Sequence, residues 1–302
     1  MIMKTGRKQH SKEILFQQDM TASCRGIIRT EKASGEMIEL KSKKEIRLMR
    51  RAGLHVHAAH EIVRGLVRPG ITTHEINEQV EDYFRRKNLE GMFKGVQLHS
   101  RQRPFPAVCC MSINEEVVHG FPSDRVLKEG DILSVDTGCR VYGWCGDSAM
   151  TYPVGTISPE TQKLLDVTKG TLDLAIELLA VKSHWNQIAA EMEAYVEDHG
   201  FSVVDTFVGH GIGREMHMEP QVANYYCRGA DFRIQPGLVI AVEPMVNVGT
   251  AKVKEGKDGW VQITADGKNS AHFEHTIAIT ERGPYVLTAG ENQYQNMNFA
   301  DY

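Results

Sequence analysis

Four carboxylate side chains lie in or beside short apolar runs that alternate like β-strands. Asp136 and Glu243 each end such a run, Asp147 follows a glycine-containing turn, and Glu274 lies within a third run. Burying a carboxylate is costly unless it is paired or binds a metal. A single buried acid is usually a salt-bridge partner, but four would need four cations, and these runs contain almost no Lys or Arg. Two divalent cations would balance the charge, so the sequence predicts strands that converge on a dinuclear metal site.

Imidazole ligands are expected from the segment Gly209–Pro220, which contains His210 and His217. Its three glycines and its proline make a helix improbable, so a helical metal-binding motif is excluded and we expect a loop. Glycine also lets the backbone approach a ligand closely. Either histidine alone would more often be a hydrogen-bonded loop residue. His119, which follows a strand predicted near 107–113, is a weak candidate when it is taken alone.

Several other histidines and cysteines are expected to have structural roles. His55, His57 and His60 lie on one predicted helix, and we expect them on a solvated or capped face. Cys109 and Cys110 have no evident base as a partner and read as small core residues. The chain has six cysteines and no CxxC pair, which argues against a structural zinc site.

The order of the predicted elements indicates a duplication. Capping boxes at Ser42–Glu45 and Thr72–Glu75 each begin a helix. A third helix is predicted from Pro159, and a fourth over roughly 185–198. Strand-like sequence follows each helix pair, and the second helix of each pair carries a similar I-x-x-x-V/M-E-x-Y pattern. Two similar halves would place a site at their interface.

Residues 1–37 lack a core pattern and are expected to form a flexible N-terminal arm, while 38–302 form the folded domain. The arm could instead be a basic contact for ribosomal RNA. With 302 residues, the chain is long enough for a substantial core. A net charge of -4 argues against a general polyanion-binding protein, so DNA is not an expected partner. No 18-residue apolar stretch occurs, so no membrane span is predicted.

Five ordered segments together resemble type I methionine aminopeptidases of the pita-bread metallopeptidase family (M24 type). They are Ser112–His119 with Gly120, Asp136 followed by Gly146-Asp147, Gly209–Pro220, Val242-Glu243-Pro244 and Glu274-His275-Thr276. The resemblance runs from about Ile38 to the C-terminus. It implies an α/β pita-bread fold, in which duplicated helix-helix-strand halves surround a central antiparallel sheet with pseudo-twofold symmetry.

The resemblance also implies an activity: removal of the initiator methionine from nascent proteins whose second residue is small. Two divalent cations (Co, Mn, Fe or Zn) would serve as cofactors, and the enzyme would be a cytoplasmic monomer that meets the ribosome transiently. The implied catalytic residues are His119, His217 and Glu243. The implied metal ligands are Asp136, Asp147, His210, Glu243 and Glu274.

The pocket for the methionine side chain is less well defined by the resemblance. His119 and His217 would contact the scissile peptide. Candidates for the apolar wall are Phe105, Cys110, Met216 and Trp260, because thioethers pack well against aromatic rings and sulfur. Met216 stands where the family often has an aromatic residue, and the segment Gln102–Pro106 replaces a Tyr/Gly-rich stretch.

Two alternatives remain open. Pita-bread relatives that cleave X-Pro bonds, as aminopeptidases or prolidases, usually carry a large extra N-terminal domain, which 37 residues cannot supply. A catalytically inactive pita-bread protein that binds the ribosome is expected to lose metal ligands, and all five are present here.

Overall fold

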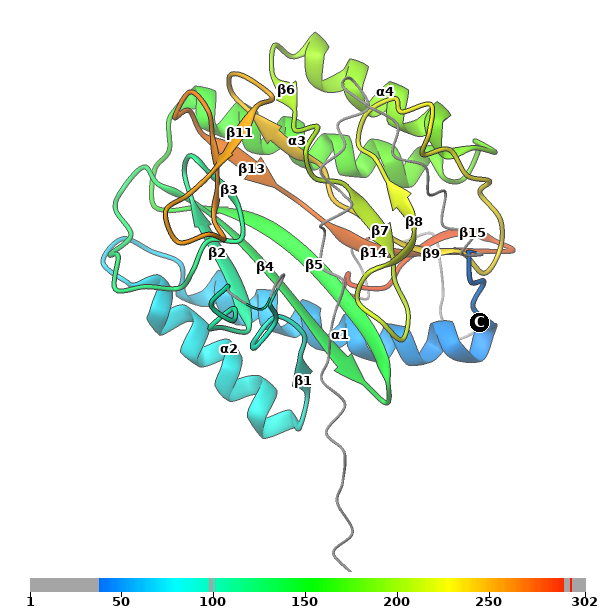
Figure 1. The fold of residues 1–302 in the computed structure, drawn as a ribbon, viewed down its shortest axis with the longest axis horizontal. Helices are drawn as coiled ribbons and strands as arrows, with labels where there is room; N and C mark the ends of the chain where they lie inside the picture. The colour runs from blue at the N-terminus through cyan, green and yellow to red at the C-terminus, as the bar shows by residue number, and fades with distance from the viewer. Residues whose placement is uncertain (1–37, 98–99, 101, 291–293, 295–302) are drawn as a thin grey trace, which may run out of the picture.

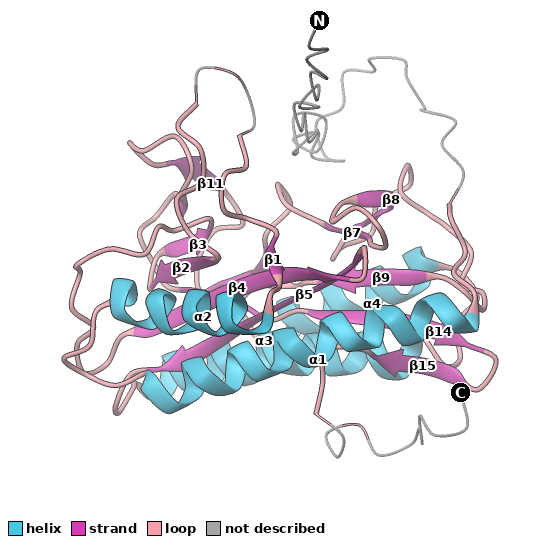
Figure 2. Ribbon diagram, turned by 90° about the horizontal axis from the view of Figure 1, so that it is seen from below, coloured by secondary structure: helices cyan, strands magenta, loops and turns pink. Residues whose placement is uncertain are grey.

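The computed structural model describes residues 38–97, 100, 102–290 and 294. The expected arm at 1–37 lies outside the described residues. The four helices in the described part of the chain lie on one side of a layer of strands (Figure 2). None of the described helices combines the length and apolar character needed to cross a bilayer.

The first half of the domain begins with two helices that the capping boxes define. Ser42 and Thr72 each accept a hydrogen bond from the backbone of the glutamate three residues later, and that glutamate bonds back to the cap. Both predicted helix starts are therefore confirmed. The elements are α1 (Lys43–Leu66), α2 (Thr73–Lys87), β1 (Glu90–Gly91), β2 (Cys109–Ile113), β3 (Glu116–Val118), β4 (Ile132–Val141) and β5 (Trp144–Pro153).

The second half repeats the order of two helices followed by strands. The Ser158 side chain caps α3, and Pro159 occupies the first turn, where its missing N–H costs nothing. The helices are α3 (Pro159–Leu178) and α4 (Trp185–Asp198). The strands are β6 (Ser202–Val203), β7 (Gly209–Gly211), β8 (Met218–Val222), β9 (Val239–Val242), β10 (Met245–Asn247), β11 (Val253–Glu255), β12 (Gln262–Thr264), β13 (Ser270–His272), β14 (His275–Thr280) and β15 (Gly283–Val286).

All strand pairs among the described residues are antiparallel. In one sheet β4 pairs with β1, β2 and β5, and in another the order is β15-β14-β9-β7-β8. Two three-stranded sheets have the orders β13-β10-β6 and β11-β12-β3. In the view of Figure 1, α1 and α2 lie along the lower edge of the strands and α3 and α4 along the upper edge, so each half contributes one helix pair to the same helical layer, as expected for a duplicated unit. The predicted pita-bread α/β class is confirmed.

The two halves meet where β5 lies beside β14. The Asp147 backbone N–H donates to the Thr276 hydroxyl, which donates to the Asp147 carbonyl, and the Glu274 N–H donates to the Ala149 carbonyl. Backbone and side chain thus join the two halves at the positions of two predicted ligands. The helices cover the other side of these strands.

The helix histidines correct one expectation. His60 is fully buried, not solvated: one ring nitrogen lies 2.9 Å from the Tyr152 hydroxyl and the other 2.9 Å from the Ser148 carbonyl. His55 bonds to the Tyr83 hydroxyl. The helix therefore presents His60 to β5 and His55 to α2, because these two rings find polar partners there.

Candidate metal centre

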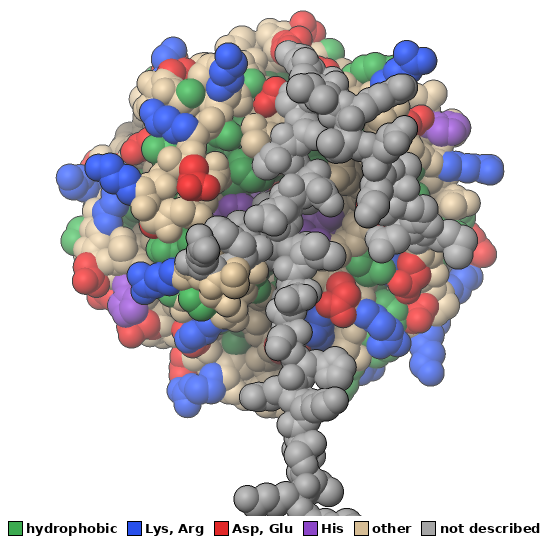
Figure 3. All heavy atoms as spheres, viewed as in Figure 1, with side chains coloured by type: hydrophobic (Ala, Val, Ile, Leu, Met, Phe, Trp, Pro, Cys, Tyr) green, Lys and Arg blue, Asp and Glu red, His purple; other side chains and the backbone are tan. Residues whose placement is uncertain are grey.

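A cavity on the open side of the strands is lined by all five predicted ligands. Histidine and hydrophobic side chains reach the surface near the middle of this face (Figure 3). His119 and His217 line the same cavity, and no Lys or Arg is among its described lining residues. The five predicted ligands in that lining are Asp136, Asp147, His210, Glu243 and Glu274.

The β4–β5 hairpin supplies the two aspartates, as the alternation predicts. Asp136 lies opposite Ala149, and Asp147 lies opposite Gly138. A Cβ atom at position 138 would lie 2.9 Å from Asp147 Oδ1, so only glycine leaves room for this carboxylate. Strand pairing and the missing side chain together bring both acids into the cavity.

The second half supplies the other three candidates at strand ends and at one central strand. Glu243 directly follows β9, and Glu274 directly precedes β14. The structure corrects the expectation of a loop at His210, because this residue is the middle of β7 and pairs with Ala241 of β9. Glycine on either side of His210 permits the strand, since a Cβ at 209 or 211 would lie under 2.5 Å from a neighbouring carbonyl oxygen.

The carboxyl groups are buried in a way that needs cations. Burial raises the pKa of Asp147 to about 7 and raises the pKa of Asp136, Glu243 and Glu274 well above the ordinary range, with neighbouring carboxylates adding to the effect on these three. Three buried oxygens, one each on Asp136, Asp147 and Glu274, have no hydrogen-bond partner in the described part of the chain. Without a counter-charge, these acids would be held partly protonated.

The donor set fits divalent metal ions. One ligand atom each from Asp147, His210 and Glu274 lies within 4.8 Å of the other two. Asp136 and Glu243 line the same cavity but are not part of this tightest group. Carboxylate and imidazole ligands suit Mn, Fe, Co and Zn. The orphaned oxygens and the lack of lysine or arginine support the same conclusion.

The protonation of His210 also suits a ligand. Its Nδ1 lies 2.9 Å from the Gly211 carbonyl, so Nδ1 carries the proton, and burial lowers the pKa of the ring to about 4. The Nε2 lone pair then faces the cavity, 3.6 Å from Glu243 Oε1 and 4.0 Å from Asp147 Oδ2. A ligating histidine commonly donates its other nitrogen to a carbonyl in this way.

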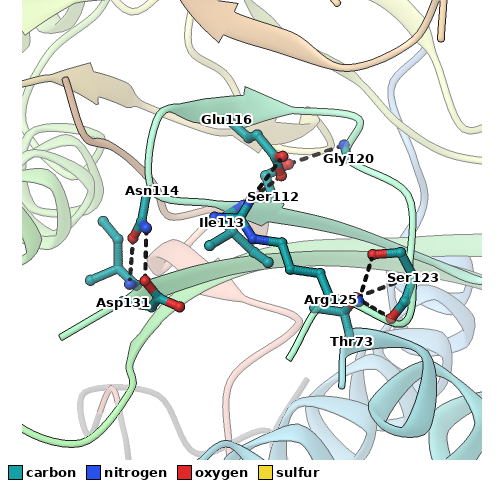
Figure 4. Close-up of polar contacts among 10 residues, drawn as sticks. Thr73, Ser112, Ile113, Asn114, Glu116, Gly120, Ser123, Arg125 and Asp131 are labelled. Atoms are coloured by element: carbon teal, nitrogen blue, oxygen red, sulfur yellow. Dashed lines mark hydrogen bonds and ion pairs between the residues drawn. The ribbon is translucent and has the colours of Figure 1, made fainter. Parts of the chain in front are cut away.

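A hydrogen-bonded hairpin presents His119, which has a left-handed backbone conformation with φ 63°. The Ser112 hydroxyl accepts the Gly120 N–H, and the Glu116 carboxylate accepts the Ile113 N–H and pairs with Arg125 (Figure 4). Burial lowers the pKa of His119 to about 4, so the ring is neutral. The hairpin thus fixes the imidazole beside the ligands.

His217 lies against the ligand histidine, with its ring centroid 4.3 Å from that of His210. Burial and the two neighbouring histidines lower the pKa of His217 well below its ordinary value. His217 and His119 are not part of the tightest ligand group.

The apolar end of the cavity contains three of the four predicted pocket residues. Phe105, Cys110 and Trp260 are lining residues, and the Phe105 and Trp260 rings meet edge-on with centroids 5.2 Å apart. Met216 is buried but is not among the lining residues. A Cβ at Gly138 would meet its methyl group at 2.2 Å, which places Met216 against the β4 backbone.

Some lining residues were missed by the sequence reasoning. The rings of His119 and Phe207 meet edge-on at 5.7 Å, yet Phe207 lies in a segment with no periodic signal. His272 carried a signal, because alternation places it on the same face as Glu274. The missed lining residues are Phe93, Val96, Val118, Phe207, Met245 and His272.

The fold and the buried acidic centre together define a metallopeptidase. The model of metallopeptidase family M24 matches residues 47–281, and the chain belongs to this family. Solved structures of prolidases share the fold: that of Pyrococcus furiosus aligns with a TM-score of 0.65 at 19% identity, over 84% of this chain and 66% of that one.

Within the family, the chain belongs with the methionine aminopeptidases and is a metal-dependent peptidase. It is 43% identical to methionine aminopeptidase 1 of Bacillus subtilis, over 83% of this chain and 99% of that protein. It is 44% identical to methionine aminopeptidase of Clostridium perfringens over the same shares. The crystal structure of the Thermotoga maritima enzyme aligns with a TM-score of 0.79 at 39% identity, covering 84% of this chain and all of that one.

Proposed function

We propose that this enzyme removes the N-terminal methionine from peptides and nascent proteins whose second residue is small. The observation that carries the proposal is a buried acidic cluster beside an apolar, aromatic-lined pocket. The acidic end suits metal-assisted hydrolysis, and the apolar end suits a thioether side chain. The similarity to methionine aminopeptidases over most of their length supports the same substrate.

We further propose that two divalent cations are held by Asp136, Asp147, His210, Glu243 and Glu274. Four carboxylates balance the charge of two such ions, and His210 completes the donor set. When bound, divalent cations lower the pKa of a water molecule and polarise the substrate carbonyl. The native metal among Co, Mn, Fe and Zn depends on availability as well as on these ligands.

The remaining chemistry falls to three side chains. Glu243 has a carboxyl group whose raised pKa suits it to accept a proton from the attacking water and to pass that proton to the leaving amine nitrogen. His217 would donate a hydrogen bond to the oxygen of the scissile carbonyl, and His119 would contact the scissile amide nitrogen. Both rings are kept neutral by burial, so each can donate one proton without carrying charge.

The walls of the cavity would select the substrate. Phe105, Cys110 and Trp260 would surround the methionine side chain, with Met216 supporting them from behind. Nascent chains are the proposed partners, met transiently at the ribosome by a monomeric enzyme in the cytoplasm.

Peptide hydrolysis by the metal-stripped protein tests the proposal. Met-Ala-Ser, Met-Lys-Ser and Ala-Pro-Ser are incubated with and without added Mn, Fe or Co, and the products are measured by mass spectrometry. We expect metal-dependent loss of methionine from Met-Ala-Ser alone. Equal cleavage of Met-Lys-Ser would contradict the preference for a small second residue, and cleavage of Ala-Pro-Ser would indicate an X-Pro enzyme. No cleavage with metals bound would favour a binding protein.

Two glutamate variants test the assignment of the proton carrier. Glu243→Gln keeps the shape of the side chain and removes the proton acceptor, so we expect activity to fall by at least about 100-fold. Glu255→Gln, on the exposed strand β11, is the matched control and should retain full activity. Near-normal turnover by Glu243→Gln would refute the role.

A further inference from the structure

His272 lines the cavity, but neither the predicted ligand set nor the proposed chemistry uses it. It is the last residue of β13, is 2% exposed, and its Nε2 has no hydrogen-bond partner in the described part of the chain. This nitrogen lies 3.6 Å from Glu243 Oε2. A buried imidazole nitrogen aimed at a catalytic carboxylate without a full hydrogen bond calls for an explanation.

The backbone holds His272 tightly in place. The Thr151 hydroxyl accepts the His272 N–H at 2.9 Å and donates to the His272 carbonyl at 2.8 Å. The Ser134 hydroxyl lies 2.8 Å from the Thr151 hydroxyl oxygen. Because Thr151 uses its only proton on the carbonyl, Ser134 must be the donor in that contact. Two strands of the first half therefore fix a residue of the second half.

The segment that carries Glu243 is tied to the same strand. His272 pairs with Met245 in the β10–β13 ladder, and the Phe273 N–H donates to the Pro244 carbonyl at 3.3 Å. The Asn224 side-chain amide holds the Glu243 carbonyl from the other side, at 3.1 Å. The relative position of the carboxylate and the imidazole is thus set by strand pairing.

Two imidazoles flank the Glu243 carboxylate, one at each oxygen. His210 Nε2 lies 3.6 Å from Oε1, and His272 Nε2 lies 3.6 Å from Oε2. His210 carries its proton on Nδ1 and faces the carboxylate with a lone pair, which only a shared cation makes favourable. An ionised carboxylate oxygen can accept a hydrogen bond but cannot donate one. The favourable tautomer of His272 therefore carries its proton on Nε2, which can donate to Glu243 Oε2.

We propose that His272 is a positioning residue: its Nε2–H donates to Glu243 Oε2 and leaves Oε1 free to face the metal site beside His210. The proposal rests on the proposed role of Glu243. A contact of 3.6 Å is a few tenths of an ångström longer than a hydrogen bond, and such contacts commonly tighten in the loaded enzyme. His272 would hold the carboxylate in the rotamer that receives and delivers the proton.

The tautomers can be read directly in the zinc-loaded protein, in which Glu243 is ionised and the metal is diamagnetic. Long-range proton–nitrogen correlation spectra of protein with ¹⁵N-labelled histidine report which ring nitrogen carries the proton. The signal of His272 is identified by its loss in His272→Gln. We expect the proton on Nε2 of His272 and on Nδ1 of His210. A proton on Nδ1 of His272 would overturn the proposal, because Nε2 would then be an acceptor or a ligand.

Kinetics separates a hydrogen bond from simple packing. His272→Leu fills space without a donor, and kcat for Met-Ala-Ser should fall by about 10- to 100-fold with KM changed little. His272→Gln supplies an amide donor and should stay within about 3-fold of the unchanged enzyme. His74→Leu, an exposed imidazole on α2, is the control. Zinc content, measured for each variant, should be unchanged.

The outcomes separate this proposal from the proposed function. Unchanged enzyme that binds zinc but releases no methionine would contradict the function. Unchanged kcat in His272→Leu, or equal losses in the Leu and Gln variants, would overturn the positioning role in an active enzyme. If His272→Leu does not fold, His272→Gln and the tautomer spectrum still decide.

Discussion

Only glycine fits at position 138, because the Asp147 side chain on the facing strand leaves no room for a Cβ atom. A Cβ there would lie 2.2 Å from the Met216 methyl group and 2.9 Å from Asp147 Oδ1. The methionine end is flexible and can move, but the carboxylate is held by its place in the site. Gly138 has no positive φ, so its backbone conformation does not require glycine. The requirement comes from the space that the Asp147 carboxylate occupies.

Gly138→Ala should accordingly weaken metal binding more than it weakens the fold. We expect metal affinity to fall by about 10-fold or more, because Asp147 must rotate away from its position beside His210. Competition with a metal-sensitive chelator measures the affinity, and urea unfolding measures stability. Gly65→Ala, in α1 with no atom within 4 Å of the new Cβ, is the control. Unchanged affinity in Gly138→Ala would contradict this account.

His60 should make stability depend on pH. Burial lowers its pKa to about 4, against 6.5 in the unfolded chain. The folded protein therefore keeps this ring neutral, and the stability it contributes is present above pH 6.5 and is lost as pH falls toward 4. Between pH 7.5 and 5.0 the loss should be about 2 kcal/mol.

Urea unfolding of metal-free protein at both pH values tests this expectation against His60→Gln. The variant cannot take up the proton, so its unfolding free energy should depend less on pH by that amount. Identical pH dependence in the two proteins would show that His60 does not titrate as its burial requires.

Single residues show how far a sequence alone can lead. The four acidic residues predicted as metal ligands could be identified from the sequence, because a carboxylate within an apolar strand is costly to bury without a cation. The prediction for His60 was wrong because helix periodicity does not reveal its hydrogen-bond partners, a hydroxyl and a carbonyl on the distant strand β5. Met216 was assigned to the wall of the pocket by the family resemblance; it is buried, but it is not among the residues that line the cavity. Such details depend on tertiary packing, which leaves no local pattern.

Two glycines let α1 pack closely against its neighbours, one in β5 and one in the helix itself. A Cβ at Gly146 would lie 2.8 Å from the backbone nitrogen of Gly53, and a Cβ at Gly53 would lie 2.1 Å from the Leu287 carbonyl oxygen. Backbone atoms on both sides leave no flexible group to move aside. The helix therefore approaches the sheet more closely than side chains would allow.

Gly146→Ala should destabilise the protein by about 2 kcal/mol or more, because the helix must shift away from the strand. Gly146→Ala should therefore affect mainly the stability of the fold, whereas Gly138→Ala, in the facing strand of the same hairpin, should affect mainly metal binding. Thermal and urea unfolding of the metal-free variants compare the two. If Gly146→Ala were as stable as the unchanged protein, α1 would not be held against β5 as tightly as these distances indicate.

Long elements were predictable and short strands were not. The helices announce their starts through capping residues, and α3 and α4 fall where leucine spacing, Pro159 and Gly200 place them. Strands of two or three residues, such as β6 and β7, are too short to display alternation. The glycine-rich sequence around His210 therefore reads as a loop, although neighbouring strands on both sides complete it as β7.

At the scale of the whole molecule, metal binding should stabilise the fold. Strands from both halves converge on the same cavity, so a cation held there by the proposed ligands would link the two halves and offset the repulsion between Asp147 and Glu274. Folded protein with metal at 1,000 times the dissociation constant gains about 4 kcal/mol, a rise in Tm on the order of 10 °C. Thermal unfolding with a chelator and with added Mn or Co measures the difference.

Glu274→Gln should reduce this metal-dependent rise while leaving the metal-free protein at least as stable, because one repelling charge is removed. Glu281→Gln, an exposed residue after β14, should keep the full rise. Equal rises in both variants would exclude Glu274 as a ligand.

The alternation along β14 has a consequence for how the gene can vary. Glu274 faces the cavity, while His275, next to it, faces the opposite side and bonds to Thr288. Loss of a single codon within this strand would turn the side chains on one side of the deletion to the opposite face relative to those on the other side. Substitutions can be absorbed one at a time here, but changes of length cannot. The turns at 142–143 and 256–259 are where insertions and deletions should be tolerated, so a deletion scan should trace the strands of the site more sharply than a substitution scan.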